Sequence, residues 1–412
     1  MSIVHPFAGL RPPTDMVSKV AAPPYDVVNS GEARAYAQGN PLSFFHISRP
    51  EIDMPEGTDE HAPEVYERGR ENLARFKRDQ ILVADPDPCF YLYRQKMGQH
   101  TQTGLVAGAS VEEYQKDLIK KHELTRADKE DDRTRHIDLL NANDEPVFLT
   151  YRSRPSIDDL VDRLTGAPPA YDFTTDDGIV HTFWVVNEKS AIEALEKEFG
   201  NVDALYVADG HHRSAAASRV QESRRKKAGA AHTGLEEYNF FLTVIFPHDQ
   251  MYIMDYNRVV KDLAGLSKEA FVERISEKFD LSPGGDKKPD APLSFGMYLD
   301  GEWHSLVAKE GSFDPKDPVG SLDVSILQNN LLEPILGIEN PRTDKRIDFV
   351  GGIRGMEELE RRVDSGECAA AFSMFPTRID QLMAIADAGM IMPPKSTWFE
   401  PKLRSGLVIH EF

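Results

Sequence analysis

Short apolar runs recur along the chain and predict strands that are largely buried. These runs cover residues 90–94, 103–111, 145–151, 171–186, 204–208, 240–246, 252–259, 293–308, 347–350 and 369–375. Several of them flank short glycine-containing turns, such as Asp176-Asp177-Gly178, which is typical of β-hairpins. Residues 40–50 also read as a strand, with His46 and Arg49 near its end.

Other segments place apolar residues every three or four positions, which predicts amphipathic helices. The expected helices cover residues 31–38, 65–76, 157–164, 189–199, 268–279, 326–336, 355–363 and 379–388. Strands, hairpins and helices in this mixture predict an α+β protein with mixed sheets. We expect an elaborated N-terminal domain over residues 1–250 and a smaller C-terminal α/β domain over residues 251–412, whose tail can complete the site of the first domain.

Composition narrows the possible functions. The 412 residues carry 48 Lys+Arg against 68 Asp+Glu, a net charge of −20, which argues against broad binding to nucleic acid or an anionic membrane. A local basic pocket for a small phosphorylated ligand remains compatible with that charge. Cys89 and Cys368 match no zinc or redox spacing, and the first residues lack a signal-peptide pattern, so we expect a cytoplasmic protein.

The densest polar chemistry stands where the strand at residues 204–208 gives way to an alanine-rich helix. Asp209, Gly210, His211, His212 and Arg213 follow one another at this turn. A new helix leaves its first N–H groups unpaired, and its dipole favours anions there. Gly210 permits a positive φ or close approach by a ligand, and Arg213 can form two hydrogen bonds to one phosphate.

Roles follow from these residue types. Asp209 can hold a metal ion or orient a histidine, His211 and His212 can move protons near neutral pH, and Ser214 can bind phosphate. The competing interpretation is an aspartate cap followed by two surface histidines. Because the group is denser than capping requires, the sequence favours a ligand-binding or catalytic role.

Residues 119–137 carry a second dense run of charges. A solvated helix explains such a run most simply. The alternative is a phosphate and Mg²⁺ site, in which Glu130 and Asp131 bind the metal and Lys129 and Arg133 bind phosphoryl oxygens. In that case Glu123 is a candidate general base.

Two further segments are candidates for phosphate or substrate binding. Prolines in residues 20–28 fix an extended path that presents Tyr25 and Asp26, although a surface arm explains the segment equally well. The tail over residues 392–406 has no periodic pattern and carries Lys395, Ser396 and Thr397, which suit phosphate binding, with a packed proline-rich tail as the alternative.

Two family resemblances follow from these motifs. Ala22-Pro-Pro-Tyr-Asp-Val, Lys121-His-Glu-Leu-Thr, Asp209-Gly-His-His-Arg and the closing Met-Pro-Pro-Lys-Ser-Thr-Trp-Phe-Glu-Pro-Lys-Leu resemble the family called domain of unknown function 1015 over nearly the whole chain. The turn at Asp209 also resembles the ParB/sulfiredoxin-like superfamily, and its two histidines resemble the free-serine kinases within it. That resemblance implies a ParB-like first domain that uses a nucleotide and Mg²⁺.

The leading functional hypothesis is phosphoryl transfer between ATP or ADP and a small hydroxyl metabolite, with free L-serine as the best guess. A phosphatase, and a non-catalytic regulator that binds a nucleotide, are the alternatives. Zinc hydrolysis on the histidines lacks a standard ligand spacing. The expected partner is a small phosphorylated metabolite or amino acid, with no nucleic acid and no membrane.

Overall fold

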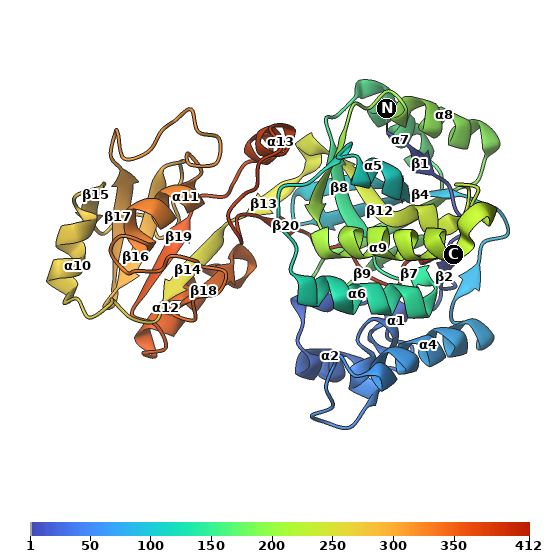
Figure 1. The fold of residues 1–412 in the computed structure, drawn as a ribbon, viewed down its shortest axis with the longest axis horizontal. Helices are drawn as coiled ribbons and strands as arrows, with labels where there is room; N and C mark the ends of the chain where they lie inside the picture. The colour runs from blue at the N-terminus through green and yellow to red at the C-terminus, as the bar shows by residue number, and fades with distance from the viewer. Residues whose placement is uncertain (1) are drawn as a thin grey trace. The chain divides into compact units, whose positions relative to one another are not determined.

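The computed structural model describes residues 2–412. The chain forms two compact units, one of Met1–Met251 with Pro401–Phe412, the other of Tyr252–Glu400 (Figure 1). The sequence-based division assigned all of residues 251–412 to one domain. The structure instead groups the last twelve residues with the first unit, because their backbone pairs with Leu10, Ala22 and Asn143 there.

A nine-stranded mixed sheet forms the centre of the first unit, with β1 (Val4–His5) pairing with β5 beside the main path. In spatial order the path contains β6 (Ile119–Lys120), β11 (Leu205–Asp209), β8 (Val147–Tyr151), β12 (Phe240–Pro247), β5 (His100–Ser110), β4 (Phe90–Met97), β10 (Val180–Val186) and β9 (Tyr171–Thr174). β11 runs parallel to β6 and β12 runs parallel to β8, whereas the other pairs are antiparallel. This mixture, together with the helices, confirms the predicted α+β class with mixed sheets.

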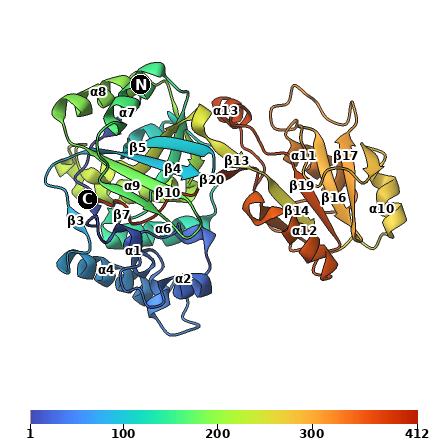
Figure 2. The ribbon, with the colours of Figure 1, turned by 180° about the vertical axis from the view of Figure 1, so that it is seen from behind.

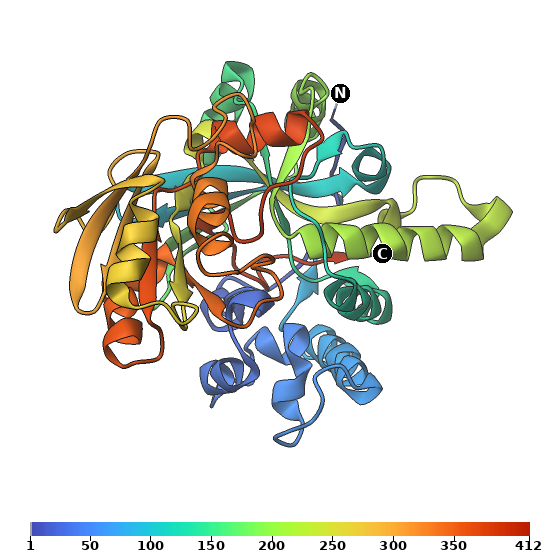
Figure 3. The ribbon, with the colours of Figure 1, turned by 60° about the vertical axis from the view of Figure 1, so that its left-hand side comes forward.

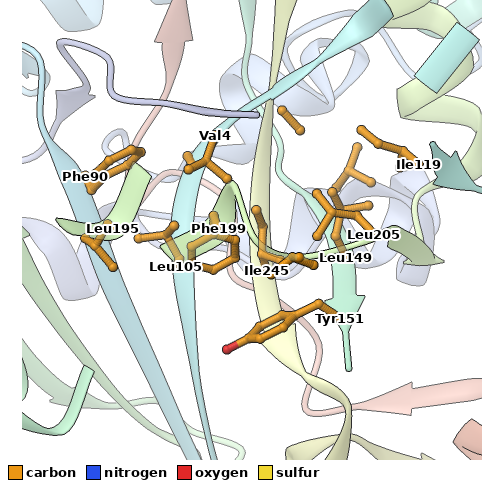
Figure 4. Close-up of a cluster of buried hydrophobic side chains, with 14 of the residues drawn as sticks. Val4, Phe90, Leu105, Ile119, Leu149, Tyr151, Leu195, Phe199, Leu205 and Ile245 are labelled. Atoms are coloured by element: carbon orange, nitrogen blue, oxygen red, sulfur yellow. The ribbon is translucent and has the colours of Figure 1, made fainter. Parts of the chain in front are cut away.

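One face of this sheet packs on α7 (Pro155–Thr165) and α8 (Lys189–Phe199). The two helices bury Ile157, Leu160, Leu195 and Phe199 against the sheet residues shown in Figure 4. Their inward positions follow the three-to-four residue spacing read from the sequence. The other core clusters of the unit lie beneath α6, α9 and the N-terminal helices.

Helices α6 (Ala127–Leu140) and α9 (His211–Ala228) lie side by side and share a small apolar cluster of Ile137, Ala216 and Val220. Figure 3 shows α9 in yellow-green beside the green-teal α6. Because α9 follows β11 directly, this packing brings the charged stretch at residues 122–136 to the same side of the sheet as the Asp209 turn.

The N-terminal part forms α1 (Val17–Val20), α2 (Ser30–Ala37), α3 (Phe45–Ser48) and α4 (Pro63–Arg78). The strand predicted over residues 40–50 is wrong, because this segment forms α3 and the following turn η2 (Pro50–Asp53). His46 closes the turn, with its ring 2.8 Å from an Asp53 oxygen and 3.1 Å from the Asn40 carbonyl. These local bonds hold a compact turn that buries Phe44, Phe45 and Ile47.

The second unit contains a six-stranded sheet that is antiparallel throughout. Its strands in spatial order are β15 (Phe279–Pro283), β17 (Glu302–Ala308), β16 (Ser294–Leu299), β19 (Ala370–Met374), β14 (Tyr256–Val260) and β18 (Ile347–Gly351), seen from behind in Figure 2. Its helices are α10 (Lys268–Ile275), α11 (Asp323–Leu327), α12 (Gly355–Asp364) and α13 (Ile379–Asp387). In both units, no helix among residues 2–412 is long and apolar enough to cross a membrane.

Candidate functional site

The candidate site is built around the start of helix α9. Gly210 adopts φ 96° and ψ 28°, and no side chain caps the helix at this end. A Cβ at this position would lie 3.2 Å from Arg213 Nε and 3.4 Å from Val147 Cα, so the turn has little room for a side chain. The first bond inside the helix runs from the Ser214 N–H to the Gly210 carbonyl (3.0 Å). The preceding amides therefore start an eighteen-residue helix whose dipole favours an anion.

Asp209 is held between the turn and the C-terminal tail. One carboxylate oxygen accepts from the Gly210 N–H (2.8 Å), and the other lies 2.8 Å from Lys402 Nζ. Burial would raise the pKa of Asp209, but the Lys402 and Arg213 cations hold it well below its usual range. Asp209 therefore stays ionised near neutral pH and positions the Lys402 ammonium at the helix start.

His211 and His122 form a buried pair beside Asp209. They are 5 % and 2 % exposed, and their rings meet edge to face with centroids 4.5 Å apart. Burial lowers the pKa of His122 to about 4, and burial together with the neighbouring His122 lowers the pKa of His211 well below its usual value. His211 Nε2 and His122 Nδ1 have no hydrogen-bond partner among the described residues. Two neutral rings therefore have nitrogens available for a ligand.

His212 connects the helix start to the loop before α6. Its Nε2 accepts a hydrogen bond from the Arg126 N–H (3.1 Å), so the ring proton belongs on Nδ1. Burial lowers the pKa of His212, whereas the nearby carboxylates of Asp26 and Glu130 act to raise it. The N-terminal segment, the start of α6 and the start of α9 thus meet around one histidine.

Arg213 points into the protein interior. It is 7 % exposed, its Nη1 donates to the Pro146 carbonyl, and its Nη2 lies 3.6 Å from Asp26 Oδ2. Burial alone would lower the pKa of Arg213, but the carboxylates of Asp26 and Glu145 raise it above its usual value. Its Nε is buried and has no hydrogen-bond partner among residues 2–412. The sequence predicted a guanidinium that forms two hydrogen bonds to a phosphate. In the structure it instead supplies positive charge beneath the turn.

A network of buried charges continues from Arg213. Glu145 Oε1 accepts from the Tyr25 N–H (3.1 Å) and from Ser405 Oγ (2.8 Å), and the Arg133 guanidinium lies over the Tyr25 ring at 4.0 Å. Burial and the adjacent Asp144 raise the pKa of Glu145. Arg133, Glu145 and Arg213 line a cavity of about 10 Å³, close to the least that holds one water molecule.

The acidic residues proposed as metal ligands are paired with an arginine. Glu130 Oε2 and Asp131 Oδ1 lie 3.6 Å and 2.7 Å from the Arg219 guanidinium, and Glu130 also accepts from the Thr125 hydroxyl. Among residues 2–412, no group of three or more His, Cys, Asp or Glu is arranged to hold a metal ion. Glu123 is partly buried in the loop before α6.

Of four further predicted site residues, one uses its side chain within α9 and three lie in the other unit. Ser214 is fully buried and its hydroxyl donates to the His211 carbonyl (3.0 Å), so α9 itself uses this hydroxyl. Lys395, Ser396 and Thr397 belong to the second unit. There Ser396 Oγ donates to the Pro393 carbonyl (2.6 Å), and the Lys395 carbonyl accepts from Arg258 (3.0 Å).

Four residues that the structure places in this site had no role in the leading hypothesis from the sequence: His122, Glu145, Lys402 and Ser405. Lys402 and Ser405 lie in the non-periodic tail, where several cations and hydroxyls are equally plausible. Glu145 immediately precedes a predicted strand, which is a recognisable position but not a distinctive one. The segments around Tyr25, residues 122–136, Asp209 and Lys402 nevertheless come together within the first unit. Such a site offers amide, lysine and imidazole donors to an anion.

A family model described as "Protein of unknown function (DUF1015)" matches residues 4–325, which confirms the family resemblance. No curated protein matches the chain.

Similar solved structures include a free serine kinase in complex with AMP, at 14% identity and a TM-score of 0.35, over 74% of this chain and 92% of that chain. A conserved hypothetical protein from Pyrococcus furiosus is similar at 13% identity and a TM-score of 0.34, over 74% and 95%. C-terminally truncated SbnI from Staphylococcus aureus is similar at 11% identity and a TM-score of 0.36, over 73% and 85%.

Proposed function

We propose that this chain, which belongs to the DUF1015 family of proteins of unknown function, transfers a phosphoryl group between ATP or ADP and a small hydroxyl metabolite. The observation that carries the proposal is the uncapped start of α9, where Lys402 lies beside Asp209 and two buried histidines have unpartnered nitrogens. Phosphoryl transfer requires positive charge and oriented donors around the transferred group more than any particular covalent chemistry.

The phosphate chain of the nucleotide belongs at the helix start. The backbone amides of His211 and His212, with the Lys402 ammonium, are the proposed donors to its oxygens. Arg213 contributes charge from below, because its side chain is directed toward Pro146 and Asp26. Ser214, Lys395, Ser396 and Thr397 are not needed in this arrangement.

In the reaction, the acceptor hydroxyl oxygen bonds to the γ-phosphorus as the bond from that phosphorus to the ADP oxygen breaks. The hydroxyl proton passes to a base, for which Glu123 and His211 are the candidates, because His212 Nε2 already accepts from the Arg126 N–H. His211 starts as a weak base, because burial lowers its pKa, but a phosphate beside it would raise that pKa. Asp209 is held by Lys402 and the Gly210 amide, so we assign it a positioning role.

Mg²⁺ fits this site only together with the nucleotide. Proteins often hold Mg²⁺ by one or two carboxylates plus substrate phosphates, and it would neutralise charge on those phosphates here. Asp209 is the carboxylate at the helix start, whereas Glu130 and Asp131 are paired with Arg219. Metal dependence is therefore a prediction to be measured.

Free L-serine is the acceptor proposed first, on the resemblance of Asp209-Gly-His-His-Arg to the free-serine kinases. The same resemblance supports a ParB-like description of the first unit as a proposal. The test is ³¹P NMR of the full chain with Mg²⁺, offered ATP or ADP with L-serine, and separately O-phosphoserine with ADP or alone. Formation of phosphoserine, or its ADP-dependent consumption, supports the transferase. Release of inorganic phosphate from phosphoserine alone indicates the phosphatase.

The matched variants are Lys402→Ala and Lys77→Ala. Both lysines form an ion pair between the tail and the rest of the first unit, but Lys77 lies on α4 and pairs with Glu411 of the tail, outside the site described above. Only Lys402→Ala should abolish the phosphorus signal. No turnover in any mixture, with ADP still bound, would reject the transferase in favour of the binding regulator.

A further inference from the structure

The cavity of about 10 Å³ beside the start of α9 has two incomplete hydrogen-bonding groups in its wall, on Glu145 and Arg213. The two residues are 6 % and 7 % exposed. Each has one buried atom, Glu145 Oε2 and Arg213 Nε, that has no hydrogen-bond partner among residues 2–412. Burying such atoms without partners costs free energy, so an occupant that bonds to both stabilises the fold.

The volume of the cavity limits what the occupant can be. A buried water molecule needs roughly 10–15 Å³ of such space and two to four polar partners. The cavity therefore admits one water molecule and excludes an organic ligand. Water suits both unpartnered atoms, because the arginine Nε–H group only donates and a carboxyl oxygen can accept. Asn143 and Asp144 also line the cavity and add polar groups to its wall.

The other oxygen of Glu145 holds two distant segments beside this cavity. Oε1 accepts from the Tyr25 N–H (3.1 Å) and from Ser405 Oγ (2.8 Å). Arg213 belongs to the first turn of α9, where the proposed nucleotide site lies. A water molecule bonded to both Glu145 and Arg213 joins the N-terminal segment and the tail to the helix start. A change of charge at Glu145 then reaches the donors that face the nucleotide.

Several neighbours set the charge of Glu145. Burial, and then the adjacent Asp144, raise the pKa of Glu145 to about 8, whereas Arg213 and Arg133 act to lower it. Burial would raise the pKa of Asp144 as well, but His136, at 2.9 Å, holds it below its usual value. The titratable and charged groups around this carboxyl pair are Tyr25, Asp26, Arg133, His136 and Arg213. Near neutral pH Glu145 thus carries a proton, and above about pH 8 it adds a negative charge beside Arg213.

We propose that one buried water molecule bridges Glu145 Oε2 and Arg213 Nε, and that Glu145 acts through it as a positioning residue for the nucleotide site. Protonated Glu145 leaves the positive charge of Arg213 available beneath the phosphates, and ionised Glu145 partly cancels it. The effect on a nucleotide rests on the proposed function, whereas the bridging water rests on the cavity and its two unpartnered atoms alone.

The water is tested by a crystal structure of the full chain without nucleotide, at a resolution that shows ordered water. We expect one water molecule within hydrogen-bond distance of Glu145 Oε2 and Arg213 Nε. A direct hydrogen bond between the two side chains, or a dry cavity, overturns the bridge.

The role of Glu145 is tested by calorimetric titration of the full chain with ADP at pH 7, 8 and 9, in two buffers of different ionisation enthalpy. ADP affinity in the parent chain should fall about threefold to tenfold from pH 7 to pH 9, the effect of up to one pKa unit of linkage. Binding at pH 8 should take up a fraction of a proton, because the phosphates favour the protonated carboxyl. Glu145→Gln keeps an acceptor for Tyr25 and Ser405 and an N–H donor toward the water, so it should bind ADP without either effect.

The matched control is Asp323→Asn in α11 of the second unit. Asp323 Oδ2 is also buried without a hydrogen-bond partner among the described residues, and burial raises the pKa of Asp323 to about 6. This variant should bind ADP with the pH dependence and proton uptake of the parent chain. The same pH dependence and proton uptake in the parent and in Glu145→Gln overturn the positioning role. A parent chain that binds no ADP overturns the proposed function together with that role, and the bridging water is then decided by the crystal structure.

Discussion

Lys402 Nζ lies 2.8 Å from Asp209 Oδ2, although the two residues are 193 positions apart. The pair joins the C-terminal tail to the strand-to-helix turn on which the proposed site depends. A lysine brought from so far along the chain couples completion of the site to docking of the tail. Removing this contact distinguishes an effect on ligand binding from an effect on folding.

A double-mutant cycle of Asp209→Asn and Lys402→Gln tests this pair. The two side chains are 32% and 19% exposed, so solvent screens them and their coupling energy in urea unfolding should be on the order of 1 kcal/mol. In Lys402→Gln, the free energy of ADP binding, measured by calorimetry, should fall by much more than the free energy of unfolding. Equal losses of ADP affinity in Lys402→Gln and in Lys77→Gln would mean that Lys402 only anchors the tail.

Removing residues 401–412 should destabilise the first unit and abolish ADP binding together. The tail pairs its backbone with Leu10, Ala22 and Asn143, and it supplies Ser405 to Glu145. Without Ser405, the buried Glu145 carboxylate loses one of its donors, which costs about 1–3 kcal/mol. Thermal unfolding and limited proteolysis measure this effect, and adding a synthetic peptide of residues 401–412 should restore ADP binding. A truncated chain with unchanged melting and ADP affinity would contradict the role of the tail.

Local patterns in the sequence predicted most of the elements and the Asp209 turn, because helix periodicity and strand runs depend on near neighbours. They could not predict that Glu145 lies under Tyr25 or that Lys402 reaches Asp209, since both contacts depend on how distant segments pack. The direction of Arg213 is a further example. Its fork was expected to face a ligand, yet Nη1 donates to the Pro146 carbonyl and Nη2 lies beside Asp26. Residues 40–50 were misassigned because the hydrogen bonds of His46 outweigh a weak strand pattern.

The stability of the folded chain should depend on His122 in acid. Burial lowers its pKa to about 4, against about 6.5 in an unfolded chain. Above pH 6.5 both states are neutral at this residue, and its contribution is fully present. As the pH falls from about 6.5 to 4, the unfolded chain binds a proton that the folded chain does not, so about 3 kcal/mol is lost. Below pH 4 the loss levels off.

Urea unfolding between pH 4.5 and 7.5 measures this dependence. His122→Gln should flatten the slope relative to the parent chain. A slope that is identical in the parent and in His122→Gln would show that His122 is not the residue whose protonation opposes folding.

Gly210→Ala should damage the site beyond its cost to the backbone. Gly210 has φ 96° and would place a Cβ 3.2 Å from Arg213 Nε, so the substitution combines a disfavoured conformation with a displaced guanidinium. Gly178 has φ 78° with nothing within 4 Å of a Cβ, so Gly178→Ala carries the backbone cost alone, about 1–2 kcal/mol. We expect Gly210→Ala to lose more stability than Gly178→Ala in urea unfolding and to weaken ADP binding at least about tenfold. Gly178→Ala should bind ADP as the parent does, and equal ADP affinity in both variants would place the nucleotide away from this turn.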